Sequence, residues 1–301
     1  MFRCRAKNPD QTHDISDRDI SHFCIYSNAN QGSPSSSPPN ETISECKSYQ
    51  GLHIAMTKIA VITPYYKESI DYLQKCHQSV LSQALDVDID IDHFFIADGH
   101  PNDVVASWPI KHVVLPVAHA DNGNTPRAIG SVLARVEGYE YIAYLDADNW
   151  FHPNHIQSLL NLRMASGADV CTSFRTIHTL DSVELNIQEK SELELKHVDT
   201  SCLMLHRNAF EAVDMWLQIP KQLAPVCDRV FLKGLMHKRF KILSTRMKTV
   251  AFRSQYRTHY LQSGLPPPID SKDDVNKDAY QWLLTLNGLK HTFEKLGFVP
   301  V

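Results

Sequence analysis

Between Lys58 and about residue 181, short apolar runs alternate with longer segments whose apolar residues recur at helical spacing. Each of the runs KIAVIT, DHFFIADG, HVVLPVA, YIAYLDAD and DVCTSFRTI predicts a strand. The segments 68–84, 125–138 and 153–167 predict the intervening helices. This alternation is typical of an α/β fold, with a mostly parallel sheet flanked by helices. Ligands of such sheets bind beyond the carboxyl ends of the strands.

Residues typical of helix ends mark two of these helices. Thr125 is the expected N-cap of one, with Pro126 in its first turn and Gly138 just beyond its end. Pro153 opens the other helix and Gly167 closes it. We therefore expect both helices to be short connections between successive strands.

Beyond Asp181 the pattern becomes mixed. The run SVELNIQE alternates like an edge strand, and HVDTSCLMLHR and RFKILSTRMKTVAFR read as extended. NAFEAVDMWLQ and VCDRVFLKGLMHK look helical, whereas GLPPPIDS interrupts regular structure. We expect one domain over residues 58–265, then a linker and a C-terminal helix over residues 266–301.

Residues 1–57 differ from the rest of the chain. They are polar and aperiodic, and they include the tract SNANQGSPSSSPPNET. Such a composition buries too little apolar surface to order itself. A buried-strand pattern begins just after Met56. We interpret residues 1–57 as a disordered leader, or as the result of a translation start assigned too far upstream (an over-called start).

Composition narrows the class of protein. The 301 residues carry a formal net charge of −4, which argues against nucleic acid as a partner. The seven cysteines form no CxxC pair, as expected for reduced thiols in the cytoplasm. We find neither an apolar stretch long enough to span a bilayer nor a signal peptide. The expected location is cytoplasmic, with peripheral membrane contact left open.

Asp146 and Asp148 form the DxD pair with the strongest context. They follow the most hydrophobic strand, where an α/β sheet presents its ligand crevice. Two desolvated carboxylates repel each other, so a divalent Mn²⁺ or Mg²⁺ is the natural compensation. The pair at 17 and 19 lies in the leader, and the aspartates of 86–92 are expected on one solvated face before a strand. A dehalogenase-type phosphatase also has a DxD pair after an apolar strand, but it needs Thr or Val at the position of Trp150. We therefore set the phosphatase interpretation aside.

The motifs ITPYYKE, IADG and YLDADNW occur in this order at the ends of three predicted strands. With them, the chain resembles family 2 glycosyltransferases of the GT-A fold over about residues 58–260. The resemblance implies an inverting, metal-dependent transfer of a sugar from a nucleotide-diphosphate sugar, UDP-linked by preference, to a hydroxyl acceptor. That acceptor would be a saccharide, a lipid-linked molecule or a protein. A non-catalytic nucleotide-sugar-binding protein of the same fold is the alternative.

The same resemblance implies the donor-binding residues. Thr63, Pro64 and Tyr65 form the turn that packs on the nucleotide base, although Tyr65 also fits a core position. Asp98 matches the acid that reads the base, and an Asp-Gly turn is equally open there. Arg127 at a helix start would pair with a phosphate or the base, unless it is only a surface arginine.

The resemblance also assigns the metal and diphosphate contacts. Asp148 would ligate the metal, and Asp146 would contact the ribose or the metal. His259 is the candidate third ligand, and Arg253 and Arg257 are candidates for the phosphates. A surface basic cluster explains the last three residues equally well.

For catalysis, the resemblance points to a carboxylate at the start of a helix in the second half. Asp228 fits that position as the general base, although Cys227 replaces the first acid of the family's usual pair. A first-turn helix charge is the alternative role for Asp228. Asp199 is the expected acceptor-binding residue.

Overall fold

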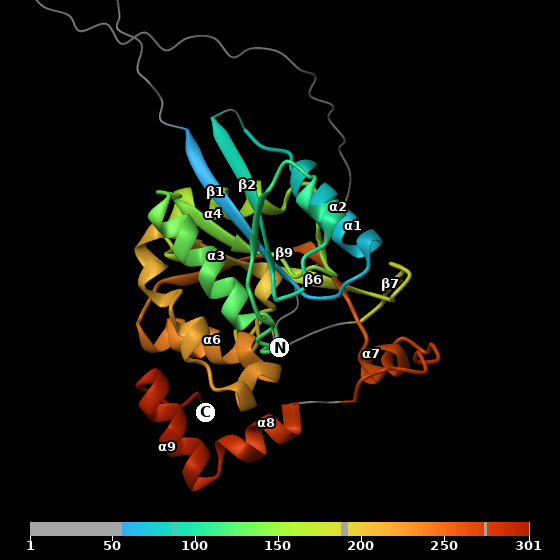
Figure 1. Cartoon of the computed structure of the whole chain (residues 1–301), viewed down its shortest axis with the longest axis vertical. Helices are drawn as coiled ribbons and strands as arrows, with labels where there is room; N and C mark the ends of the chain where they lie inside the picture. The colour runs from blue at the N-terminus through green and yellow to red at the C-terminus, as the bar shows by residue number, and fades with distance from the viewer. Residues whose placement is uncertain (1–55, 87, 188–191, 274–275, 301) are drawn as a thin grey trace, which may run out of the picture. The chain divides into compact units, whose positions relative to one another are not determined.

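The computed structural model describes residues 56–86, 88–187, 192–273 and 276–300 (Figure 1). The expected leader, with its DxD pair at 17 and 19, lies outside these residues except for its last two positions. None of the helices in the described ranges combines the length and apolarity needed to cross a bilayer.

The first half of the sheet is parallel, as the alternating pattern predicts. It contains β1 (Thr57–Tyr65), β2 (Ile89–Ala97), β3 (Lys111–Val114) and β4 (Tyr141–Tyr144). β1 lies between β2 and β4, and β3 pairs with the outer side of β2. β1 and the end of β2 are apolar on both faces because the sheet buries them on both sides.

The second half of the sheet is mixed. It contains β5 (Trp150–Phe151), β6 (Val170–His178), β7 (Glu184–Leu185), β8 (Leu203–His206) and β9 (Ile242–Arg253). Over the described residues the strand order is β3-β2-β1-β4-β8-β6-β9-β5, with β7 on β6. β8 runs antiparallel to both β4 and β6, whereas β6 and β9 are parallel. The GT-A class with a mixed second half is confirmed.

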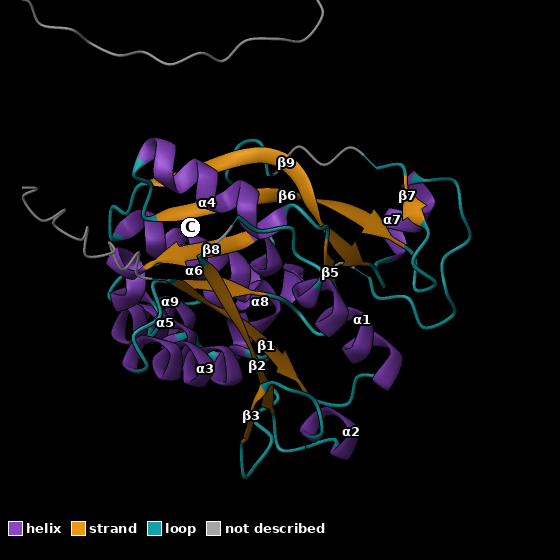
Figure 2. Cartoon of the chain, turned by 90° about the horizontal axis from the view of Figure 1, so that it is seen from above, coloured by secondary structure: helices purple, strands orange, loops and turns teal. Residues whose placement is uncertain are grey.

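Helices cover both faces of this sheet (Figure 2). The α-helices are α1 (Ile70–Leu81), α2 (Asp103–Ala106), α3 (Asn124–Val136), α4 (His155–Ser166), α5 (Met215–Gln218), α6 (Cys227–His237), α7 (Arg257–Gln262), α8 (Asn276–Leu283) and α9 (Leu286–Leu296). Three 3-10 turns, η1 (Thr200–Cys202), η2 (Arg207–Ala212) and η3 (Lys221–Val226), complete the described elements. α3 packs on β1 and β2, whereas α4 packs on β6 and β9.

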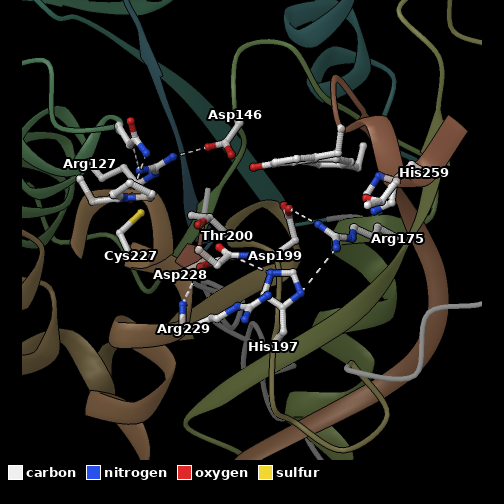
Figure 3. A pocket seen from close by; sticks show the side chains of 17 residues that line it. Arg127, Asp146, Arg175, His197, Asp199, Thr200, Cys227, Asp228, Arg229 and His259 are labelled. Carbon is white, nitrogen blue, oxygen red and sulfur yellow. Dashed lines mark hydrogen bonds and ion pairs between the residues drawn. The ribbon is translucent and has the colours of Figure 1, made fainter. Parts of the chain in front are cut away.

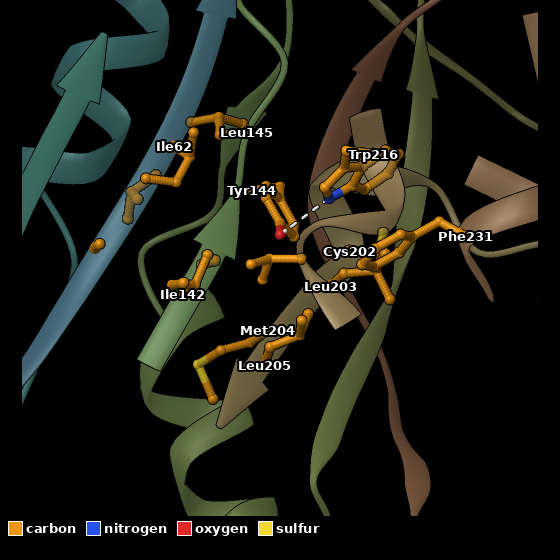
Figure 4. Packing of buried hydrophobic residues seen from close by; sticks show 14 of the residues in the cluster. Ile62, Ile142, Tyr144, Leu145, Cys202, Leu203, Met204, Leu205, Trp216 and Phe231 are labelled. Carbon is orange, nitrogen blue, oxygen red and sulfur yellow. Dashed lines mark hydrogen bonds between the residues drawn. The ribbon is translucent and has the colours of Figure 1, made fainter. Parts of the chain in front are cut away.

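The core lies where β4 meets β8 and α5 (Figure 4). Tyr144 and Trp216 are fully buried, and the Trp216 indole N–H donates to the Tyr144 hydroxyl at 3.1 Å. The Trp216 ring also stacks on Phe231 of α6, with centroids 3.9 Å apart. Burial of three large aromatic rings stabilises the fold and fixes α5 and α6 beside β4. α6 therefore starts close to the end of the DxD strand.

Three expectations about local structure were wrong. Thr125 is not the N-cap of α3, because Gly123, with a φ of 78°, occupies that position and the Thr125 hydroxyl donates instead to Asp121. The C-terminal helix is two helices, α8 and α9, because Thr285 caps a new start by accepting from the Gly288 N–H. β2 begins at Ile89, so Asp92 lies within the strand and accepts a hydrogen bond from Tyr139.

Candidate active site

A cavity of about 560 Å³, here called the strand-end pocket, opens where β1, β2 and β4 end. Its lining includes five acidic side chains: Glu68, Asp98, Asp121, Asp146 and Asp148. Arg127 at the start of α3 and Lys272 also line it. The position beyond the parallel strands agrees with the rule for α/β sheets.

Asp146 and Arg127 form the central contact of this pocket. The Arg127 guanidinium donates to Asp146 Oδ1 at 2.5 Å and to the Asn122 carbonyl at 2.6 Å. Arg127 is buried, whereas the Asp146 side chain keeps 27% of its surface exposed. Burial lowers the pKa of Arg127, but Asp146, together with Cys227 and Asp199, outweighs this effect and raises the pKa. Arg127 therefore stays charged, and it is not a surface arginine.

Asp148 lies in the same pocket in a strongly acidic environment. Burial, followed by the nearby carboxylates of Asp146, Glu68 and Asp199, raises the pKa of Asp148 to about 7. A carboxyl with this pKa gains from a bound cation, because the cation compensates the repulsion. Carboxylate oxygens beside an open pocket also fit a hard divalent ion that completes its shell with phosphate oxygens. The donor set is therefore chemically suitable for Mg²⁺ or Mn²⁺.

The expected third ligand is not gathered with the two aspartates. Among the described residues, no three His, Cys, Asp or Glu side chains form a group that could hold a metal ion. His259 lines a different cavity, and its Nδ1 lies 2.7 Å from the Ser254 hydroxyl. The structure therefore does not bring His259 together with Asp146 and Asp148 as a preformed set of three metal ligands.

The strand-end residues expected to bind the base divide into two groups. Pro64 and Tyr65 line the pocket, and the Tyr65 hydroxyl lies 2.7 Å from Nε2 of His112. Thr63 instead points into the core, where its hydroxyl lies 2.8 Å from Nε2 of His93. Thr63 and Tyr65 share one face of β1, but Thr63 lies further from the carboxyl end of the strand and is fully buried.

Asp98 shapes one wall of the strand-end pocket. Its carboxylate accepts hydrogen bonds from the backbone N–H groups of His119 and Ala120, at 2.9 and 3.1 Å. Gly99 follows with a φ of 74°, and a Cβ there would collide with the backbone of Ala118. Asp98 therefore both precedes the glycine of an Asp-Gly turn and lines the strand-end pocket.

A second cavity, of about 300 Å³ and here called the α6 pocket, shares Asp146 with the strand-end pocket (Figure 3). Asp228, the second residue of α6, lines it together with His197 and Asp199. Burial raises the pKa of Asp228, but the interactions with His197 and then Arg229 outweigh it and lower the pKa. Asp228 is therefore an ionised carboxylate at neutral pH, beside an open cavity.

Asp199 is engaged by protein groups on both of its oxygens. Oδ1 accepts from the Ser201 N–H at 3.0 Å, and Oδ2 accepts from Arg175 at 2.7 Å. Burial raises the pKa of Asp199, although Arg175 opposes the effect. Asp199 lines the α6 pocket, and it also caps η1.

Arg253 and Arg257 line neither pocket. The Arg253 guanidinium is buried, donates to the Asp148 and Leu180 carbonyls, and lies 3.8 Å above the Tyr72 ring. Arg253 thus holds the DxD turn in place. Arg257 lies on the surface and pairs with Asp273 at 3.0 Å.

Arg175, His197 and Lys272 are among the pocket residues that sequence reasoning missed. Lys272 lies beside the strand-end acids because its segment pairs with the one after β9, through the Lys272 N–H and the Gln255 carbonyl at 2.7 Å. His197 meets Asp228, and Arg175 meets His197, only in the folded chain. No local pattern marks any of the three, because long-range pairing creates each contact.

Comparisons with known proteins agree with this geometry. The sequence profile described as glycosyl transferase family 2 matches residues 60–221, more than half of the chain. A search of curated proteins found no match. In this chain the matched region includes the strand-end motifs, the DxD pair and Asp199.

Solved structures share the fold at low sequence identity. The crystal structure of S. aureus TarS 1-349 in complex with UDP is similar at 13% identity and a TM-score of 0.52, over 80% of this chain and 70% of that one. The crystal structure of S. aureus TarS is similar at the same identity and TM-score, over 78% of this chain and 41% of that one. The motifs, the fold and the profile match together show that the chain belongs to glycosyl transferase family 2.

Proposed function

We propose that the protein is an inverting, metal-dependent glycosyltransferase that uses a nucleotide-diphosphate sugar, UDP-linked by preference. The observation that carries this proposal is the shared border of the two cavities. Asn122, Arg127 and Asp146 line both, so a donor in the strand-end pocket would present its sugar toward the α6 pocket. An in-line displacement needs the donor and the acceptor on opposite sides of the reacting carbon, and two cavities that meet at shared residues support this proposal.

On the donor side, Pro64 and Tyr65 offer an apolar and aromatic wall for a base. Asp146 and Asp148 would hold Mn²⁺ or Mg²⁺, which when bound supplies positive charge at the leaving diphosphate. Lys272 is the exposed cation of the same lining and is suited to a phosphate oxygen. UDP, found with the similar TarS 1-349 structure, is the nucleotide we propose to test first.

On the acceptor side, Asp228 would accept the proton of the attacking hydroxyl. The acceptor oxygen forms a bond to the anomeric carbon while the bond from that carbon to the diphosphate breaks. Asp228 is already ionised at neutral pH, so it can take this proton without a prior step. The proposed acceptor is a saccharide, a lipid-linked molecule or a protein. The proposed location is the cytoplasm, and peripheral contact with a membrane is left open.

Hydrolysis and transfer assays with a panel of UDP-sugars, with and without Mn²⁺, test this proposal. We expect metal-dependent turnover, and NMR of the released sugar should show the anomer opposite to that of the donor. Asp228→Asn should keep UDP binding but lose turnover. The matched control is Asp71→Asn, which removes an exposed acid from the first turn of α1 and should leave turnover unchanged.

Binding of UDP without any turnover would instead support the non-catalytic nucleotide-sugar binder. Full activity of Asp228→Asn would move the base elsewhere. Retention of the donor's anomer would exclude the single displacement.

A further inference from the structure

A chain of polar contacts leads from the wall of the α6 pocket to Asp228 (Figure 3). Asp199 Oδ2 accepts from Arg175 Nη1 at 2.7 Å, and Arg175 Nη2 lies 3.5 Å from His197 Nδ1. His197 Nε2 lies 2.6 Å from Asp228 Oδ2. The members come from β6, from the segment before η1 and from α6. The contacts thus join three parts of the chain that are distant in sequence.

The direction of these hydrogen bonds follows from the chemistry of the groups. A guanidinium only donates, so the His197 Nδ1 that faces Arg175 must act as the acceptor. The ring proton is then on Nε2, which donates to the ionised Asp228. The remaining oxygen, Oδ1, accepts from the Arg229 backbone N–H at 2.7 Å. Each carboxylate oxygen of Asp228 is therefore oriented by one donor.

Resting on the proposed function, we propose that His197 is the positioning residue of the Asp228 base, held in its Nε2–H tautomer by Arg175. His197 keeps its proton during the reaction. The proton of the acceptor hydroxyl goes to Asp228, as the acceptor oxygen bonds to the anomeric carbon and the diphosphate leaves. The role of His197 is to fix the direction of the carboxylate, since a small misplacement of a catalytic group costs on the order of 100-fold in rate.

The charged surroundings of Asp228 support this role. Besides His197, the nearby groups that influence it or its partners are Cys227, Arg229, Arg175, Glu192, Asp199 and Tyr256. Cys227 stays a neutral thiol because burial raises its pKa to about 12. Glu192 and Asp199 pair with Arg175, at 3.3 and 2.7 Å. Among these groups, His197 is the one whose side chain lies within hydrogen-bond distance of the Asp228 carboxylate.

The pKa of Asp228 gives the expected pH effect. The interaction with His197 lowers that pKa, so removing the donor raises it. A base must be ionised to act, and the acid limb of the rate profile follows its pKa. Loss of the His197 donor should therefore move this limb to higher pH, and loss of orientation should lower the rate on the plateau as well.

The test compares His197→Gln with His197→Asn. The Gln amide nitrogen reaches about the position of Nε2 and keeps a neutral donor to Asp228, whereas Asn offers the same amide one methylene too short. With UDP-sugars and Mn²⁺, His197→Asn should lose on the order of 100-fold in kcat. Its acid limb should move to higher pH, and His197→Gln should recover most of both. UDP affinity should stay unchanged in both variants.

His206→Ala is the control variant. His206 is about as buried as His197 and approaches Glu140 at 3.7 Å, but it lies outside both pockets. The His206→Ala variant should leave the pH profile of the rate unchanged. Wild-type rates and profile in His197→Asn would overturn the inference. An inactive His197→Asn beside an active Asp228→Asn would also overturn it, because it would make His197 the base.

The second readout is the ring tautomer of His197, measured by ¹⁵N NMR on the ligand-free protein. We expect the proton on Nε2, and a proton on Nδ1 would overturn the inference. This readout needs no substrate. Failure of the wild-type protein to turn over any nucleotide sugar would thus count against the proposed function alone, while the tautomer still decides the arrangement of His197.

Discussion

The contact between Arg127 and Asp146 gives a prediction about stability whose size follows from the structure. Arg127→Met keeps a good helix former in α3 and an apolar side chain near Trp216, but it removes the guanidinium. The change leaves the Asp146 carboxylate facing Asp148 and Asp199, and it deprives the Asn122 carbonyl of its donor.

Breaking one side of a buried pair costs about 3–5 kcal/mol. The Asp146 side chain keeps 27% of its surface exposed, so water recovers part of the loss. We therefore expect Arg127→Met to lower the free energy of unfolding by about 3 kcal/mol. Urea denaturation, followed by circular dichroism, measures this change.

Arg257→Met is the matched control. Arg257 also pairs with an aspartate, Asp273, at 3.0 Å, but the two side chains are 46% and 84% exposed. Such a surface pair contributes about 1 kcal/mol or less. If Arg127→Met costs no more than Arg257→Met, the Arg127–Asp146 pair does not hold the pocket together. In Arg127→Met/Asp146→Asn the cost should be smaller than in Arg127→Met alone, because no unpaired carboxylate remains.

Three further predictions concern the donor pocket and the leader. The apparent Mn²⁺ affinity, measured by calorimetry, should rise about tenfold from pH 6 to pH 8. The reason is that the Asp148 carboxyl, with a pKa of about 7, is mostly protonated below pH 7, and only its ionised form ligates a cation. A flat profile would refute the assignment of Asp148 as a ligand, and Asp148→Asn should abolish the pH dependence. Lys272→Met should weaken UDP binding about tenfold in a fluorescence titration, whereas Lys290→Met on the exposed face of α9 should not; equal affinities would remove Lys272 from the phosphate site. Deleting residues 1–55 should change the melting temperature and the turnover little, and a large loss of either would show that the domain needs the leader.

The strand ends of the site could be predicted from the sequence because the information is local. A buried strand ends where its apolar run ends, so the places of Tyr65, Asp98 and Asp146 followed from periodicity alone. The parallel order of these strands then brought the three residues to one edge. The position of Arg127 near the start of α3 could be predicted for the same reason.

The contacts that complete the site could not be predicted, because they depend on side-chain direction and long-range pairing. The contact of Thr63 with His93 depends on the register of β1 against β2. Arg253 reads as a phosphate-binding arginine in a basic segment, yet backbone carbonyls and the Tyr72 ring surround it. His197 reaches Asp228 across 31 positions of sequence. Nothing near either residue marks that contact.

A calorimetric titration of UDP into the protein, with and without Mn²⁺, tests the central claim most directly. The claim is that Asp146 and Asp148 hold a cation that joins a nucleoside diphosphate to the strand-end pocket. We predict that UDP binds in the presence of Mn²⁺, that chelation of the metal weakens this binding strongly, and that Asp148→Ala loses the dependence on metal. Equal UDP affinity with and without Mn²⁺ in the wild-type protein, or no UDP binding in either case, would contradict the account.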